Sequence, residues 1–299
     1  MVEMKKMLYL AQWFFRARFL GRRAPLQTVL FIGDRCNLQC KHCSVYQKEN
    51  PHEMTFEQVR EHLAYSYSQG SRFVDFEGGE TMLWRDGDRN INDLIDLAKQ
   101  MGFFSATITT NAQLPFGGCR ADSIWVSLDG TGKYHEAVRG QGTFARLEKN
   151  IATAGHPHLS VNMVVNTLNW QDVDNTIAYA KENPHIESIS INFHTPFPGT
   201  EYLSLDKERR AQIIYRVIAY KKKGYPIMNS VSGLKKMRSG NFKRRCWVTN
   251  FIYPDGSRGL CIGNGTDICN DCGFCMAGEM ACVFAFKPDT ILAGMKLRV

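Results

Sequence analysis

The 299-residue sequence contains no apolar run near the roughly 18 residues that a membrane-spanning helix needs. An export signal is also missing, because Arg16 and Arg18 interrupt the apolar N-terminal stretch and no small-residue cleavage site follows it. Internal repeats and low-complexity tracts are absent. We therefore expect a cytoplasmic globular protein, in a reducing compartment where clustered thiols bind metal more often than they form disulfides.

Acidic side chains are the scarcer charged class. The sequence has 29 Asp and Glu against 37 Lys and Arg, a formal charge of +8, while hydrophobic residues make up 44% as in ordinary soluble domains. This balance favours anionic partners such as nucleotides, phosphates, acidic lipids or an acidic redox protein. A solvated basic surface explains the charge equally well, so the charge does not choose among these partners.

Apolar runs alternate with amphipathic segments through the middle of the chain. The predicted buried strands are 28–32, 72–76, 104–109, 124–128, 159–165 and 186–192. The predicted helices are 55–69, 91–101, 143–154, 171–182 and 206–223. Thr55 and Asp206 are the expected N-caps of two of these helices. Proline and glycine interrupt 111–123, which predicts a shortened connection there.

This alternation predicts an α/β fold with a parallel sheet and crossover helices. Six βα units are fewer than the eight of a closed barrel, so we expect a partial (β/α)6 barrel with its active site at the carboxyl ends of the strands. The expected organisation is an amphipathic helix in 1–26, the barrel in 27–224, a linker in 225–245 and a small cysteine-rich module in 246–299. The module has little periodic structure, so its fold is predicted to depend on metal.

Nine of the ten cysteines fall into two groups, and Cys119, which stands alone, is predicted to be a packing residue. The first group is Cys36, Cys40 and Cys43, directly after the strand 28–32. Three thiolates on one loop can ligate three irons of a cubane cluster and leave the fourth iron open for a ligand. A zinc site is the alternative, but His42 is adjacent to Cys43 and would strain the loop as a fourth ligand.

The C-x3-C-x2-C spacing of these cysteines after the first strand resembles the radical S-adenosylmethionine (SAM) superfamily. That resemblance implies a [4Fe-4S] cluster whose open iron chelates SAM, with an electron donor such as flavodoxin or ferredoxin. It further implies that reduced SAM is cleaved to methionine and a 5′-deoxyadenosyl radical, which abstracts a hydrogen or adds to an alkene. His42 matches the family's aromatic position beside the adenine.

Further matches to the family lie at the expected strand ends. Glu77-Gly78-Gly79-Glu80 resembles the motif that binds the SAM amino group, with Thr81 in place of the usual proline. Glycine allows close backbone approach, and a carboxylate suits an ammonium group. The resemblance therefore implies that SAM is bound by His42, Gly78, Gly79, Glu80, Asn111, Ser127 and Arg139. For Arg139, which would help hold the SAM carboxylate, a surface ion pair is the alternative.

The second cysteine group comprises Cys246, Cys261, Cys269, Cys272, Cys275 and Cys282. A tight turn at Pro254-Asp255-Gly256 is predicted to fold a hairpin that brings Cys246 and Cys261 together. The spacing C-x9-G-x4-C around this turn resembles the opening of SPASM and twitch domains, which hold auxiliary iron–sulfur clusters. We expect one auxiliary [4Fe-4S] cluster, held by Cys246, Cys261 and two of the remaining four cysteines. Two clusters or a structural zinc site are the alternatives.

The N-terminal segment mixes aromatic and basic residues. Such a helix either covers the open side of the barrel or lies on an anionic membrane surface. The stretch from Trp13 to Cys43, with Gly21-Arg22-Arg23 before Pro25, is similar to the start of proteins related to adenosylhopane synthase, which couples the deoxyadenosyl group to an isoprenoid alkene. This second resemblance is carried by short motifs.

The sequence leaves the substrate open. A SPASM-like module implies hydrogen abstraction from a peptide, protein or natural product, whereas the N-terminal segment implies radical addition to a lipid. His194, Tyr46 and Asp129 are candidate proton or hydrogen donors. An alternative of another class is a non-catalytic iron–sulfur or zinc protein that binds nucleic acid. Chemistry-bearing residues at successive strand ends argue against that alternative.

Overall fold

The computed structural model describes residues 2–43, 51–261 and 263–298, so Tyr46 lies outside the described residues. The strands are β1 (Gln27–Phe31), β2 (Phe73–Glu77), β3 (Ser105–Thr110), β4 (Ser123–Ser127), β5 (Leu159–Val165), β6 (Ser188–Phe193), β7 (Thr249–Ile252) and β8 (Arg258–Gly259). The helices are α1 (Val2–Phe19), α2 (Phe56–Gln69), α3 (Ile91–Gln100), α4 (Lys133–Arg139), α5 (Thr143–Ala154), α6 (Val173–Glu182), α7 (Lys207–Lys222), α8 (Val231–Ser239), α9 (Cys275–Val283) and α10 (Pro288–Arg298).

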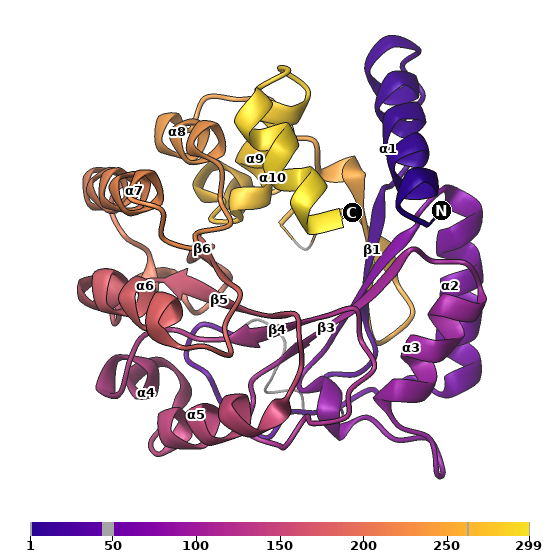
Figure 1. Cartoon of the computed structure of the whole chain (residues 1–299), viewed down its shortest axis with the longest axis horizontal. Coiled ribbons are helices and arrows are strands. Elements are labelled where there is room, and N and C mark those ends of the chain that lie inside the picture. The colour runs from indigo at the N-terminus through magenta and orange to yellow at the C-terminus, as the bar shows by residue number, and fades with distance from the viewer. Residues whose placement is uncertain (1, 44–50, 262, 299) are drawn as a thin grey trace.

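The strands form one sheet in the order β6-β5-β4-β3-β2-β1-β7-β8. All neighbouring pairs are parallel except β7 and β8. Figure 1 shows the sheet curved, with α2 to α6 around its outside and α9 and α10 on its open side. The six predicted strands and the open α/β barrel are therefore confirmed. The hairpin predicted at Pro254-Asp255-Gly256 is also present, as β7 and β8.

Strand alternation gives the sheet an apolar outer face and a polar inner face. Leu30, Phe76 and Ile108 are fully buried in the main hydrophobic core between the sheet and its helices. Burying one such side chain contributes about 1.5–3 kcal/mol. The residues between them on the strands, such as Asp75 and Thr107, point to the other face. That face lines the inside of the barrel, so the site is built on polar side chains.

Local sequence signals fix several boundaries. Thr55 caps α2 in a capping box, accepting from the Gln58 backbone N–H at 3.2 Å, and Asp206 caps α7, accepting from the Arg209 N–H at 2.7 Å. Both predicted caps are confirmed. The connection from β3 to β4 contains no helix, as predicted. In this turn Ala112 has a positive φ of 56°, and Asn150 holds its carbonyl with a 2.8 Å hydrogen bond.

The predicted linker 225–245 contains a helix that sequence reasoning missed. Ser230 caps α8 by accepting from the Gly233 N–H at 2.9 Å, and α8 packs closely on α9. The approach requires glycine, because a Cβ at Gly278 would lie 2.7 Å from the Gly233 carbonyl oxygen. Glu279 of α9 accepts a hydrogen bond from the Ser230 backbone N–H. The helix is short and basic, and α7, α9 and α10 pack on it.

Helix α1 packs on the fold through one apolar face. A second small core joins Trp13 of α1 to Leu26, Phe73, Val248 and Phe284, which places the helix at the amino-terminal ends of β1, β2 and β7. The Trp13 indole donates to the Ala24 carbonyl at 2.8 Å. Among the described residues, no helix is long and apolar enough to cross a membrane.

Candidate functional site

The first cysteine group lies on the loop that follows β1. Cys40 is buried, while Cys36 and Cys43 are partly exposed. The three thiols are electrostatic neighbours, since Cys36 interacts with Cys43 and Cys40 interacts with both. The Lys41 N–H donates to the Val138 carbonyl at 3.0 Å, which ties this loop to α4. The structure therefore brings the three predicted ligands together at the carboxyl end of a barrel strand.

The glycines of the Gly-Gly-Glu motif hold the cysteine loop in place. A Cβ at Gly78 would lie 2.4 Å from the Gly33 carbonyl oxygen, and one at Gly79 would lie 2.2 Å from that of Arg35. The Gly79 N–H donates to the Gly33 carbonyl at 2.9 Å. A side chain at either position would push the cysteine loop away. Sequence reasoning assigned these glycines to SAM and missed their contact with the loop.

Glu80 joins the ends of β2 and β3. Its carboxylate is buried and accepts from Thr110 Oγ1 at 2.7 Å, from the Asn111 N–H at 2.7 Å and from the Met82 N–H at 3.0 Å. Burial raises the pKa of Glu80, and these hydrogen bonds oppose the rise. The carboxylate thus positions Asn111. The Asn111 amide in turn donates to Asn37 Oδ1 at 2.8 Å and lies 3.7 Å from Cys36 Sγ.

Arg139 is buried beside the cysteine loop, so the surface ion pair considered for it is wrong. Its Nε donates to Asp129 Oδ2 at 2.7 Å, and its Nη1 lies 3.8 Å from Cys40 Sγ. Asp129 also accepts from the Val164 N–H at 2.8 Å. Burial by itself would raise the pKa of Asp129, but Arg139 and His42 outweigh burial and lower it. The pair places a fixed positive charge next to Cys40.

Two more predicted residues belong to this region. His42 Nε2 lies 3.6 Å from Asp129 Oδ2, and burial lowers the pKa of His42 to about 4, so the ring is neutral at pH 7. Ser127 ends β4 and is paired with Asn162 of β5 on the inner face of the barrel. His194 is an electrostatic neighbour of both His42 and Asp129. The predicted SAM-site residues therefore converge on the mouth of the barrel around the cysteine loop.

Two polar groups are directed at thiols of the cysteine loop. Three thiols on one loop, with the Asn111 amide and the Arg139 guanidinium directed at two of the sulfurs, suit an iron–sulfur cluster, whose sulfurs accept hydrogen bonds. Residues 30–180, about half of the chain, match the family model described as Radical SAM superfamily.

The chain belongs to the radical SAM superfamily. It is an enzyme, and its cofactors are SAM and a [4Fe-4S] cluster. The non-catalytic nucleic-acid-binding alternative is thereby set aside.

Similar proteins include enzymes with different substrates. A probable GTP 3′,8-cyclase from Methanocella arvoryzae is 26% identical over 181 residues, which cover 56% of this chain and 57% of the relative. Streptococcus suis SuiB bound to SAM superposes with a TM-score of 0.65 at 18% identity, over 82% of this chain and 62% of SuiB. The complex of anSMEcpe with SAM and the Cp18Cys peptide superposes with a TM-score of 0.61 at 17% identity, over 92% of this chain and 83% of anSMEcpe. These structural likenesses establish the fold.

In the second cysteine group, four thiols lie near one another, and a fifth, Cys275, neighbours one of these four. Cys246 is an electrostatic neighbour of Cys261, Cys269 and Cys272, and Cys261 is also a neighbour of Cys269 and Cys272. All four are partly exposed. Of the remaining pair, Cys275 neighbours Arg210, Glu279 and Cys272, whereas Cys282 neighbours Glu279 and Thr290. Both thiols of this pair are buried.

The segment that follows Cys272 is fastened to the carboxyl end of β6. The Gly273 N–H donates to Thr195 Oγ1 at 2.9 Å, and its carbonyl accepts from the Phe193 N–H at 3.0 Å. The Cys275 N–H donates to Asn192 Oδ1 at 2.8 Å. A Cβ at Gly273 would lie 1.7 Å from the Phe193 carbonyl oxygen, so only glycine allows this approach. The cysteine-rich region therefore forms one side of the barrel mouth.

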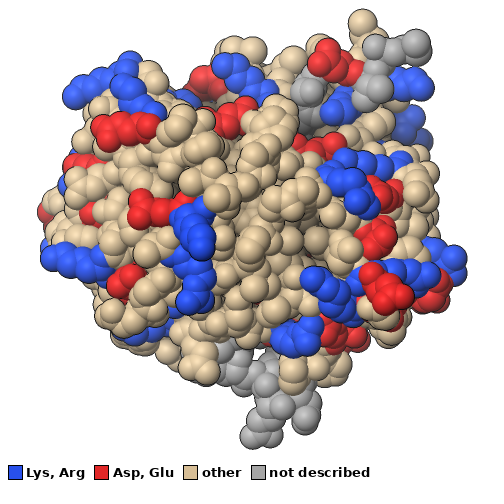
Figure 2. All heavy atoms as spheres, turned by 60° about the horizontal axis from the view of Figure 1, so that its bottom comes forward, with Lys and Arg blue, Asp and Glu red and all other residues tan. Residues whose placement is uncertain are grey.

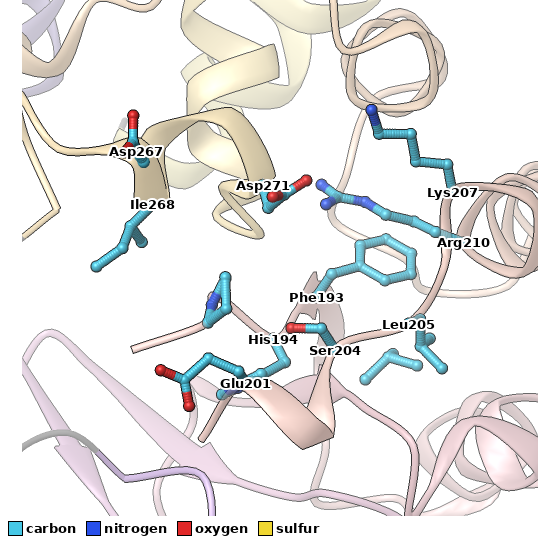
Figure 3. Close-up of a pocket in the computed structure, with 12 residues that line it drawn as sticks. Phe193, His194, Glu201, Ser204, Leu205, Lys207, Arg210, Asp267, Ile268 and Asp271 are labelled. Atoms are coloured by element: carbon cyan, nitrogen blue, oxygen red, sulfur yellow. The ribbon is translucent and has the colours of Figure 1, made fainter. Parts of the chain in front are cut away.

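A cavity of about 470 Å³ lies between this region and the barrel. Figure 3 shows Lys207 and Arg210 of α7 on one side, Asp271 directed toward the Arg210 guanidinium, and Glu201 and His194 below. Arg210 donates to the Cys272 carbonyl at 2.8 Å, and its guanidinium lies 4.8 Å from the Phe193 ring centre. Because His194 also neighbours His42 and Asp129, the cavity adjoins the SAM-site residues. Sequence reasoning found only His194 of this cavity.

Glu77, on the inner face of β2, is a titratable group that the sequence did not single out. Burial and then the neighbouring Asp75 raise the pKa of Glu77 to about 7, while a hydrogen bond from Thr109 opposes the rise. At a pH between the ordinary glutamate pKa and about 7, Glu77 is therefore protonated in the folded state and ionised in the unfolded chain. The free energy of unfolding therefore falls as the pH rises through this range. Above the range, the folded state bears the full cost of burying the ionised Glu77 carboxylate.

We expect Glu77→Gln to raise the melting temperature more at pH 8 than at pH 5, because glutamine has no charge to bury. The gain at pH 8 is expected to be roughly 1–3 kcal/mol, or a few degrees in a domain of this size. Thermal melts of the purified protein at the two pH values measure it. Glu182→Gln, at the exposed end of α6, is the control and should show no such difference. Equal increases in melting temperature at both pH values would show that ionisation of Glu77 does not lower the stability.

Proposed function

We propose that this enzyme reductively cleaves SAM and uses the resulting radical to abstract a hydrogen from a peptide, protein or natural-product substrate. The observation that carries the proposal is the buried Arg139–Asp129 pair, which sets a guanidinium 3.8 Å from Cys40 Sγ at the end of a barrel strand. A bound cluster supplies one electron, taken from a donor such as flavodoxin or ferredoxin, to break SAM into methionine and the 5′-deoxyadenosyl radical.

The residues of the chain then have separate tasks. Cys36, Cys40 and Cys43 hold the cluster. Arg139, oriented by Asp129, offers a fixed cation to the SAM carboxylate, and bidentate pairing of this kind gives both strength and orientation.

The remaining contacts orient the other parts of SAM. The neutral His42 ring offers a flat surface to the adenine, and Asn111 and Ser127 offer polar contacts from the ends of neighbouring strands. The backbone of Gly78, Gly79 and Glu80 faces the amino group. Enclosing SAM and substrate together excludes water from a reactive radical.

The auxiliary cluster is proposed to be held by Cys246, Cys261, Cys269 and Cys272. They are the four neighbouring thiols of the C-terminal region. Four thiolates complete the ligation of a [4Fe-4S] cluster, so this cluster would transfer electrons or organise the module. A single cluster is the simpler account because Cys275 and Cys282 are buried, whereas the four proposed ligands are partly exposed.

The charges around the cavity support a peptide-like substrate. Glu201, Asp267 and Asp271 contribute three carboxylates to its wall, and Lys207 and Arg210 contribute two cations. A segment that carries both charges and apolar groups can be paired with this wall, whereas a polyphosphate would meet three like charges. Solved complexes of SuiB with the precursor peptide SuiA and of anSMEcpe with the Cp18Cys peptide have the same fold.

A second candidate is radical addition to an isoprenoid lipid at a membrane surface. One observation favours it: the outward face of α1 is apolar and exposed, with Leu8, Phe15 and Phe19 more than half accessible. The mixed charges of the cavity suit an isoprenoid chain less well, so the peptide-like substrate remains the leading proposal.

The test of the proposed function is formation of 5′-deoxyadenosine. Protein purified without oxygen and reconstituted with iron and sulfide is incubated with dithionite and SAM, and the products are separated by chromatography and identified by mass. We expect slow production without substrate, because uncoupled cleavage needs only SAM and an electron. A reconstituted protein that contains iron but yields no 5′-deoxyadenosine would overturn the proposal.

The same assay with GTP separates the two substrate classes suggested by the relatives. We expect GTP neither to accelerate 5′-deoxyadenosine formation nor to be consumed, since the cavity wall carries more carboxylates than cations. Acceleration by GTP together with a new nucleotide product would replace the peptide-like assignment.

A further inference from the structure

We propose that the outward face of α1 docks the enzyme on an anionic lipid bilayer, with the helix lying in the plane of the surface. Figure 1 shows α1 at the periphery of the fold, with the end that leads to β1 projecting from it. The proposal concerns where the enzyme works and does not depend on the identity of its substrate.

The outward face is an apolar stripe at helical spacing. Met4, Leu8, Ala11, Phe15 and Phe19 follow one another by four, three, four and four positions, which places them on one side of a helix. The large side chains among them are 53–63% exposed. Exposure of such an apolar face to water is unfavourable in a monomer. A stripe of this length therefore marks an interaction site rather than chance exposure.

The stripe is not needed for folding, because the opposite face of α1 already packs on the protein. Trp13 lies 5.9 Å from Trp247 and from Phe284, and Tyr9 lies 5.5 Å from Phe104, between ring centres. The helix therefore has two apolar faces. One fixes its position on the fold, and the other remains open to a partner.

Cations flank the stripe and identify the partner as anionic. The first 33 residues carry Lys5, Lys6, Arg16, Arg18, Arg22 and Arg23 but only one acidic residue, Glu3. No ion pair is formed by these cations within the described part of the chain.

Arg18 and Arg23 also stand close to a third cation. Burial lowers the pKa of Arg245, and the charges of Arg18 and Arg23 lower it further. By contrast, Lys and Arg are interspersed with Asp and Glu on the face shown in Figure 2. Cations held together without carboxylates favour a surface of negative charge.

A bilayer meets both requirements at once. An interfacial helix inserts its apolar stripe to the level of the acyl chains while flanking Lys and Arg contact anionic headgroups. Arg18 is placed for this role, since its guanidinium lies 5.5 Å from the Phe19 ring centre and 5.6 Å from that of Phe286, which is itself half-exposed. A second copy of the chain is less suitable, because symmetric pairing of two stripes would bring like charges together.

The test is co-sedimentation of the full-length, reconstituted enzyme with vesicles of phosphatidylcholine alone or of phosphatidylcholine and phosphatidylglycerol at three to one. We expect binding to the anionic vesicles that falls with added salt, and at least tenfold weaker partitioning for Phe15→Ser/Phe19→Ser. Tyr202→Ser/Tyr215→Ser is the matched control, since it removes two similarly exposed aromatic rings elsewhere and should bind as wild type. Both variants should retain 5′-deoxyadenosine formation.

Three results would overturn the proposal. The first is equal partitioning to neutral and anionic vesicles, and the second is equal partitioning of the two variants. The third is the absence of vesicle binding together with a dimer, seen by light scattering, that Phe15→Ser/Phe19→Ser dissociates, which would assign the stripe to a second copy. Because 5′-deoxyadenosine formation is measured on the same samples, failure of docking is distinguishable from failure of the proposed reaction.

Discussion

Replacing Cys36, Cys40 and Cys43 together by alanine is expected to remove about half of the bound iron and all 5′-deoxyadenosine formation. With one catalytic and one auxiliary cubane, wild type should hold about eight irons, and the variant about four. The loop can still fold, because Gly78 and Gly79 hold it through its backbone. Iron and sulfide analysis beside the dithionite assay measures both effects.

Cys119→Ala is the control for this variant. Cys119 lies in the main hydrophobic core, as predicted from its isolation, so its removal should cost a little stability and leave both iron content and activity unchanged. Retention of eight irons by the triple variant, or of 5′-deoxyadenosine formation, would show that these cysteines do not hold the catalytic cluster.

The barrel could be predicted from sequence because its signals are local. Strand and helix periods, the caps at Thr55 and Asp206 and the broken connection after β3 all lie within a few residues of the features they determine. The observed strands begin and end within two residues of the predicted ones. The site followed from the same logic, since parallel strands bring their carboxyl ends, and hence Cys36, Asn111 and Arg139, to one edge.

The features that were missed depend on contacts between distant segments. β7 extends the barrel sheet by pairing with β1, more than 200 residues earlier in the chain. Helix α8 packs closely on α9 because Gly233 and Gly278 allow the approach, and these two helices are distant in sequence. In the same way, the sequence cannot show that Thr110 and Asn111 donate hydrogen bonds to the Glu80 carboxylate.

These distant contacts give the site a common design. Glu80 positions Asn111, and Asp129 positions Arg139, so two buried carboxylates orient the two donors nearest the cluster cysteines. Conservative variants should separate positioning from ligation: Asp129→Asn removes the charge that holds Arg139 without touching a cysteine. Breaking a buried ion pair of this kind lowers the stability of the fold, because the remaining charge, here that of Arg139, stays buried without an opposite charge.

The auxiliary cluster gives the second large effect. Cys272→Ala is expected to lose up to about four irons, and with them one signal of the reduced protein in electron paramagnetic resonance, because a cubane needs its four ligands. The same variant should melt at a lower temperature, since the metal-dependent module is fastened to β6 through the adjacent Gly273. Slow 5′-deoxyadenosine formation should persist, as the catalytic cluster has its own cysteine loop.

Cys275→Ala is the matched control, three residues further along the same segment. Its thiol is buried beside Arg210 and Glu279, so the variant should keep about eight irons and both signals. Cys282→Ala should have the same effect as Cys275→Ala, because the Cys282 thiol is buried beside Glu279 and Thr290. If instead Cys275→Ala lost the iron and Cys272→Ala kept it, the cluster would have to be held by a different set of four cysteines. Loss of iron in all three variants would indicate two auxiliary clusters sharing the six cysteines of the C-terminal region.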